Sequence, residues 1–257
     1  MPGLGKYIYC IIESNNERNF GPIGIGGRGD NVTTVGYRDL SAVVSNTIME
    51  KYVIGRENMM AHERVIEEVM KEYTVLPVRF CTIATSAEEL RNLLRRRYPE
   101  FKKSLRSMDG KVELGLKARW RDESEVIREV TEENAEVREE GSRLAKAPGD
   151  DPGARDEKVE LGKKVKALLE EKRKEVAEKI LMKLRKAAVD ILANQLTTDD
   201  MVLNAAFLVD RFHEREFDSL VGDLEDDIGE RVALSYVGPA PPFNFVNISV
   251  EWTQEAG

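Results

Sequence analysis

The chain has 257 residues, enough to bury one large hydrophobic core or two ordinary ones. Charged residues make up 33% of it and the net charge is −8, which argues against a protein whose affinity comes from neutralising nucleic-acid phosphates. The sequence contains no N-terminal apolar signal segment and no apolar run near the roughly 18 residues that a membrane span needs, so we expect a cytoplasmic protein.

The first part of the chain alternates strand and helix signals. Runs rich in β-branched and aromatic residues predict strands at residues 7–12, 32–35, 40–44 and 74–80, the second and third forming a hairpin. Apolar periodicity predicts helices at residues 58–73 and 86–105, and Ser86 with Glu89 forms a capping box at the start of the second. Pro77 cannot donate to a strand ladder, so strand 74–80 is predicted to lie at a sheet edge.

The charged middle of the chain, residues 122–196, predicts a helical arm. From residue 155 onward one apolar stripe indicates a helix of some forty residues, made of Leu161, Val165, Leu168, Leu169, Val176, Ile180, Leu184, Ala188 and Ile191. A thinner stripe runs through residues 123–146, and the proline- and glycine-rich residues 147–153 between the two indicate a loop. The six charged residues 170–175 are expected to stand in water. The arm is predicted to be a helical hairpin, and the simplest interpretation of it is a solvated spacer.

On either side of the arm lie the signals of a second sheet. Strands are predicted at residues 112–120, 201–209, 231–237 and 243–250, with a helix at residues 213–224. Strand, helix, strand, helix, strand is the ferredoxin-like order, with the arm inserted in the first crossover. The predicted fold is α+β, with an N-terminal domain at 1–109 and a ferredoxin-like domain at 110–257, each a small mixed or antiparallel sheet with packed helices.

Residues that could carry catalysis are scarce. The chain has two histidines, His62 and His213, and each begins a helix with a polar face. His62 is followed by Glu63, but Ile66 stands where the zinc-protease motif needs a second histidine. Metal binding would have to use carboxylates without a recognisable ligand spacing. We therefore predict no enzymatic activity, no cofactor and no metal.

Six segments in order resemble the GvpF/GvpL family of gas vesicle proteins. They are residues 7–9 (YIY), 39–45 (DLSAVVS), 62–68 (HERVIEE), 75–80 (VLPVRF), 203–209 (LNAAFLV) and 238–246 (GPAPPFNFV). The chain departs from the family at Cys10 and Cys81, where glycine is frequent, and at Ala240 and Phe243, where tryptophan and tyrosine are. The resemblance implies a two-domain α+β accessory or minor structural protein of the gas vesicle, one of whose relatives is placed at the gas-facing surface.

The resemblance also implies partners. It predicts binding to the small hydrophobic shell protein and to other gas vesicle accessory proteins, and no binding to nucleic acid, membrane or small-molecule substrate. An open sheet edge, at residues 75–80 or 243–250, could add a strand from the shell protein, and the arm stripe could lie against its apolar face. The candidate contact residues are Leu168, Ile180 and Leu184 on the arm, together with Phe243 and Phe245, whose alternative role is ordinary core packing.

A second hypothesis is a small-molecule sensor, because ferredoxin-like domains often bind ligands between sheet and helices. A thermal-shift screen separates the two hypotheses, since a ligand at 100 times its dissociation constant stabilises a protein by about 2.7 kcal/mol.

Overall fold

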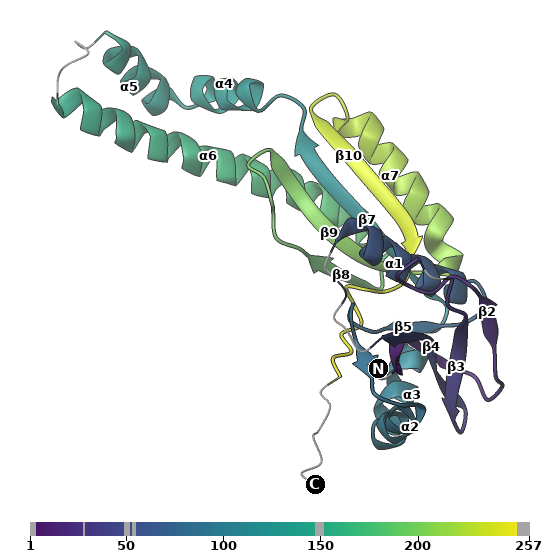
Figure 1. Cartoon of the computed structure of the whole chain (residues 1–257). Helices are drawn as coiled ribbons and strands as arrows, with labels where there is room; N and C mark the ends of the chain where they lie inside the picture. The colour runs from purple at the N-terminus through teal and green to yellow at the C-terminus, as the bar shows by residue number, and fades with distance from the viewer. Residues whose placement is uncertain (1–3, 28, 49–51, 53–54, 147–151, 251–257) are drawn as a thin grey trace. The chain divides into compact units, whose positions relative to one another are not determined.

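The computed structural model describes residues 4–27, 29–48, 52, 55–146 and 152–250. The chain forms two compact units (Figure 1). Unit 1 contains the residues up to Leu114 together with those from Gly238 onward, and unit 2 contains Gly115–Val237. The predicted second domain, 110–257, includes the C-terminal residues, whereas residues 238–250 group with unit 1. The predicted boundary between two independently folding domains, after residue 109, stays a prediction.

Unit 1 is built on an antiparallel sheet of order β2-β3-β4-β1-β5, and the short β6 also pairs with β1. The strands are β1 (Leu4–Glu13), β2 (Asn19–Gly21), β3 (Val32–Tyr37), β4 (Leu40–Ile48), β5 (Val75–Pro77) and β6 (Ile83–Ala84). The predicted hairpin is confirmed as β3–β4. The predicted edge position of the strand around Pro77 is confirmed by the place of β5 at the end of the order.

Both faces of β1 are buried, and helices cover each face. The register of β1 against β4 shifts between Ile8 and Cys10, and this bulge puts the successive residues Tyr9 and Cys10 on the same side of the sheet. That side packs against α1 (Arg56–Met70) through Val65. The other side carries Ile8 and packs against α2 (Ala87–Arg96) and α3 (Tyr98–Met108). Unit 1 is therefore a sheet between two helical layers.

The helix predicted at residues 86–105 is wrong in one respect, because it is two helices that meet at Arg97. Pro99 stands in the first turn of α3, and proline is disfavoured in the interior of a continuous helix. The predicted cap at Ser86 is confirmed, since its Oγ accepts a hydrogen bond from the Glu89 amide at 3.2 Å. The Glu89 carboxylate accepts from Thr85 and not from Ser86.

The strand predicted at residues 243–250 is wrong. Within that segment only Ile248 forms a bridge, a single parallel one with Val78. The amides of Phe243 and Phe245 donate instead to the carbonyls of the prolines just before them, at 2.7 and 3.2 Å. These local turn bonds use the donors that a strand ladder would need.

Unit 2 is built on an antiparallel sheet of order β10-β7-β9-β8. Its strands are β7 (Lys111–Trp120), β8 (Asp190–Ala193), β9 (Met201–Asp210) and β10 (Val232–Ala240), of which β7 begins in unit 1 and β10 ends there. Its helices are α4 (Glu123–Glu133), α5 (Ala135–Ala145), α6 (Pro152–Leu184) and α7 (Glu214–Ile228), with a 3-10 turn at Arg211–His213. If β7, β8, β9 and β10 are numbered 1 to 4 in chain order, their order in the sheet is 4-1-3-2. This is the ferredoxin-like order, which confirms the predicted fold.

The long arm helix ends earlier than predicted. The helix α6 stops at Leu184, and residues 190–193 form β8, paired antiparallel with β9. The Val189 amide donates to the Leu208 carbonyl at 2.8 Å, so the last predicted turns of the helix are a sheet edge. The helical arm is then α4 and α5 packed along α6, with a length of about 50 Å for the 33 residues of α6 (Figure 1). The predicted loop at 147–153 lies mostly outside the described residues.

Candidate partner-binding site

The apolar stripe of α6 is largely covered within the chain. Ile180 and Leu184 are fully buried, and α4 and α5 present Val126, Val130, Val137 and Leu144 as their buried side chains. At Gly141 a Cβ atom would lie 3.8 Å from Leu161, so α5 and α6 approach each other closely. The stripe residues of α6 before Ile180 are half-buried, so the arm is a packed helical hairpin that covers part of its own apolar stripe.

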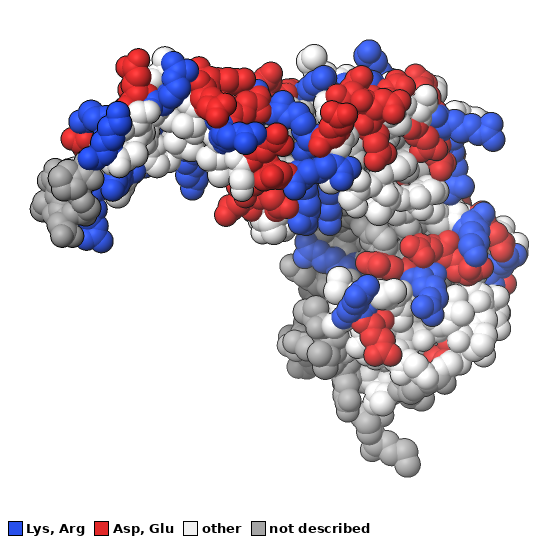
Figure 2. Space-filling model, turned by 90° about the horizontal axis from the view of Figure 1, so that it is seen from above, with Lys and Arg blue, Asp and Glu red and all other residues white. Residues whose placement is uncertain are grey.

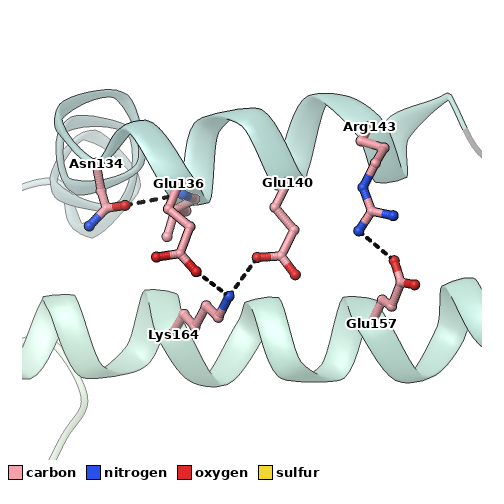
Figure 3. A network of polar contacts seen from close by, with 7 residues as sticks. Asn134, Glu136, Glu140, Arg143, Glu157 and Lys164 are labelled. Carbon is pink, nitrogen blue, oxygen red and sulfur yellow. Dashed lines mark hydrogen bonds and ion pairs between the residues drawn. The ribbon is translucent and has the colours of Figure 1, made fainter.

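Ion pairs connect α5 with α6 alongside this seam, and one lysine of α6 lies between two glutamates of α5. The Lys164 ammonium is 2.7 Å from the Glu136 carboxylate and 2.8 Å from that of Glu140 (Figure 3). These hydrogen bonds raise the pKa of Lys164 above its ordinary value and lower the pKa of Glu136. Nearer the arm's tip the polarity is reversed, with Arg143 of α5 donating to Glu157 of α6 at 2.7 Å. Figure 2 shows the resulting mixture of acidic and basic side chains over the arm.

A second lysine of α6 repeats the arrangement against α4. The Lys172 ammonium is 3.1 Å from Glu129 and 3.9 Å from Glu133. Glu129 also accepts from Arg231, and although partial burial raises its pKa, the two cations lower it overall. Lys172 and Arg173 are both mostly buried, so the expectation that residues 170–175 stand in water is wrong for these two.

Asn134 separates α4 from α5 and caps both helices. It adopts an extended conformation, its Oδ1 accepts from the Val137 amide at 3.1 Å, and its own amide donates to the Val130 carbonyl at 3.3 Å. Opposite this break lies a cavity of about 260 Å³. It is lined by Val130, Glu133, Asn134, Leu168, Glu171, Lys172 and Glu175. We call it the arm groove.

The structure places the five candidate contact residues in three different settings. Leu168 is half-buried and lines the arm groove, whereas Ile180 and Leu184 are enclosed in unit 2. Phe243 is half-buried and packs against the unit 1 core cluster that contains Tyr7 and Tyr9, and Phe245 is half-buried. The structure brings Leu168, Ile180 and Leu184 together on α6, and Leu168 is the one that faces a concave surface.

The glutamates of the arm groove are the residues that sequence reasoning missed. Two signals pointed to them: Asn134 interrupts the stripe of residues 123–146, and the charged run 170–175 interrupts that of α6. The sequence could not show that these two interruptions lie opposite each other across the hairpin.

The predicted open edges differ between the units. In unit 1 the edge next to β5 is partly occupied, because Val78 bridges Ile248 and the Arg79 amide donates to the Ile248 carbonyl at 3.4 Å. In unit 2 the edge strands are β8 and β10. Near β8, Val189 and Leu192 are exposed by 53% and 40%.

His62 lies inside unit 1, where it is 4% exposed. Its Nδ1 is 3.0 Å from the Tyr7 hydroxyl, and its ring stacks on Tyr9. Burial lowers the pKa of His62 to about 4, although a hydrogen bond to the Val78 backbone raises it. The imidazole is therefore neutral at neutral pH and held in an aromatic cluster. His213 is exposed, 3.9 Å from Asp210.

Within the described residues, no helix is both long and apolar enough to cross a bilayer. No group of three or more His, Cys, Asp and Glu side chains in the same residues is arranged to hold a metal ion.

Comparison with known proteins identifies the family. The family model described as gas vesicle synthesis protein GvpL/GvpF matches residues 5–247. Gas vesicle protein F1 of Halobacterium salinarum is 30% identical over 255 residues, which cover 98% of this chain and 97% of that protein. Gas vesicle protein F of a Streptomyces species is 29% identical over 246 residues, which cover 95% of this chain and 100% of that protein.

Two crystal structures have the same fold. GvpF from an Anabaena species superposes with a TM-score of 0.83 at 21% identity, over 96% of this chain and 99% of its own. GvpF from Microcystis aeruginosa superposes with a TM-score of 0.78 at 24% identity, over 94% of this chain and 98% of its own. The family model covers nearly the whole chain, and the chain therefore belongs to the GvpL/GvpF family of gas vesicle synthesis proteins.

Proposed function

We propose that this protein is a non-enzymatic accessory protein of the gas vesicle, which binds the hydrophobic shell protein and assists its assembly. The observation that carries the proposal is the match of the gas vesicle synthesis family over residues 5–247. The coarser part, a gas vesicle accessory role, follows from membership of the family. The finer part rests on the surfaces that the chain offers to another protein.

The arm is the first of these surfaces. A shell subunit that is largely apolar needs a surface that covers its apolar face before it polymerises. Leu168 in the arm groove is the predicted arm residue that a partner can reach without the hairpin opening. Ile180 and Leu184 act indirectly in this proposal, by holding α6 in place from inside unit 2.

Phe243 and Phe245 form the second proposed contact. Both rings are half-buried, and the segment that carries them forms a turn and not a strand. An aromatic ring that is half-covered by its own core presents a rigid apolar surface at little entropic cost. We place the protein's site of action in the cytoplasm at the growing gas vesicle, with contact at the gas-facing side of the shell and with other accessory proteins.

Capture of the purified shell protein by variants of the immobilised chain tests the proposal. Leu168→Asp places a charge on the groove floor and is expected to reduce capture at least about tenfold, because an apolar contact is replaced by a carboxylate that must be desolvated. Val159→Asp is the matched control: Val159 lies on the same helix, is 55% exposed and does not line the groove. Equal capture by the wild-type protein and both variants would remove the arm from the shell-binding surface.

A further inference from the structure

The arm itself shows what a pair of glutamates four residues apart can hold. Glu136 and Glu140 enclose the ammonium of Lys164, and Glu129 and Glu133 approach that of Lys172. In each case the glutamates belong to one helix and the lysine to the helix packed against it. Carboxylates at this spacing lie on one face of a helix, where they repel each other unless a cation lies between them.

Glu171 and Glu175 of α6 have the same spacing. Among the described residues neither forms an ion pair or a hydrogen bond through its carboxylate, and both are exposed. The helix that would supply their lysine is interrupted opposite them, since α4 ends at Glu133 and α5 begins at Ala135. The pair therefore faces the arm groove and not another helix.

The arm groove has the shape and charge of a site for a long basic side chain. Its apolar lining comes from Val130 and Leu168, and its charged lining is three carboxylates and one ammonium, a formal charge of −2. The volume of the groove is about 260 Å³, and the groove is open to solvent. Lysine and arginine cover apolar surface with their methylene chains while their charged ends stay among polar groups.

We propose that the arm groove receives a lysine or arginine side chain from a basic, amphipathic segment of another protein. The aliphatic part of this side chain lies on Val130 and Leu168, and its cationic end lies between Glu171 and Glu175. This inference goes beyond the proposed function, since it states the chemistry of an occupant and holds whether or not that occupant is the shell protein.

The test uses the full-length chain and a fluorescent amphipathic peptide made of leucine and lysine, with binding followed by anisotropy. The double variant Glu171→Gln/Glu175→Gln keeps the shape of the groove and removes both charges. We expect it to bind the peptide about tenfold more weakly than the wild-type chain, because two charge-assisted hydrogen bonds are lost. A peptide with glutamate in place of every lysine is expected not to bind.

The matched control is Glu139→Gln/Asp156→Asn, which removes the same number of charges from exposed positions of α5 and α6 that do not line the groove. We expect it to weaken binding less than about twofold, because exposed charges at a distance are screened by salt. Leu168→Lys provides an internal cation three residues before Glu171 and is expected to weaken peptide binding as the double variant does. Equal weakening by the groove and control variants would mean general attraction to an acidic surface and would overturn the proposal, as would unchanged binding by both.

Failure of this test is distinguishable from failure of the proposed function, because the peptide assay contains no shell protein. A chain that binds the peptide through the groove but captures no shell protein would keep the inference and remove the shell protein as occupant.

Discussion

Tyr7, on the interior strand β1 of unit 1, holds His62 in place from 55 residues away. The Tyr7 hydroxyl accepts a hydrogen bond from the Cys81 amide at 3.0 Å and is 3.0 Å from His62 Nδ1, to which it can donate its own proton. Burial raises the pKa of Tyr7 and lowers that of His62, so both groups stay neutral. From the sequence His62 looked like part of a polar helix face, because glutamates follow it at positions 63, 67 and 68. Only the fold shows that tyrosines enclose it.

This burial predicts a pH-dependent stability. The pKa of His62 falls from 6.5 in the unfolded chain to about 4 in the folded protein, so between these values the unfolded chain binds a proton that the folded protein does not. The contribution of His62 is therefore complete above pH 6.5 and is lost as the pH falls towards 4. At pH 5 the loss is about 2 kcal/mol.

Urea unfolding of the wild-type chain and of His62→Gln, at pH 7.5 and pH 5, measures this loss of stability. Glutamine does not titrate, so the variant should lose less stability than the wild-type chain between pH 7.5 and pH 5. The difference between the two losses is expected to be about 2 kcal/mol. The pKa of Glu63 is raised by burial and by Glu67, and this effect is common to both proteins and cancels in the difference. An identical pH dependence in the two proteins would show that His62 is accessible to protons in the folded state.

At the scale of elements, the arm is a hairpin whose apolar seam and ion pairs have different roles. The seam buries Val126, Val130, Val137 and Leu144, and burial of this kind carries most of the stability of a helix pair. The ion pairs lie mostly at the surface and set the alignment of α5 along α6 more than its stability. The groove arises where the seam is interrupted at Asn134.

Two glycines of the hairpin give a matched prediction. Gly162 has open space around it, so Gly162→Ala should stabilise the protein through helix propensity alone, by about 1 kcal/mol. At Gly141 a Cβ atom would be in ordinary contact with Leu161 at 3.8 Å, so Gly141→Ala should stabilise by at least as much. Thermal unfolding of the two variants compares them. Destabilisation by Gly141→Ala alone would mean that α5 and α6 lie closer together than described.

The elements predicted correctly from the sequence are those in which local pattern and tertiary pairing agree. The arm helix α6 as far as Leu184, the β3–β4 hairpin and the strands β1, β7 and β9 each have a pattern that their partners complete. Ala188 and Ile191 continued the helical spacing, but pairing with β9 decides the local structure and makes β8. Residues 243–250 have strand-like composition, yet Pro241 and Pro242 begin a turn there. The arm groove depends on two interruptions, at Asn134 and at residues 170–175, which lie 36 to 41 residues apart and which sequence patterns cannot align.

At the scale of the molecule, the chain passes between the units at two points, after Leu114 and after Val237. The last described residues return to unit 1 and contribute to its core. Ile248 is 5% exposed within the cluster that contains Ile8 and Phe101. Glu113 accepts two hydrogen bonds from Asn244, one from the backbone amide at 2.7 Å and one from the side-chain amide. Burial raises the pKa of Glu113, and these two bonds offset part of that rise.

Ile248→Ala tests this assignment. Loss of a buried isoleucine side chain is expected to cost about 2–4 kcal/mol. Hydrogen exchange followed by mass spectrometry should show faster exchange in peptides from β1, α2 and α3, with α7 and β9 unchanged. Faster exchange confined to unit 2 would contradict the grouping of residues 238–250 with unit 1.

The most direct test of the account as a whole is co-expression of the shell protein with this chain, followed by size-exclusion chromatography of the clarified lysate. The shell protein is expected to elute together with the chain and to be absent from this fraction when the chain is omitted. A shell protein whose recovery and elution are the same with and without the chain would contradict the claim that this protein binds it.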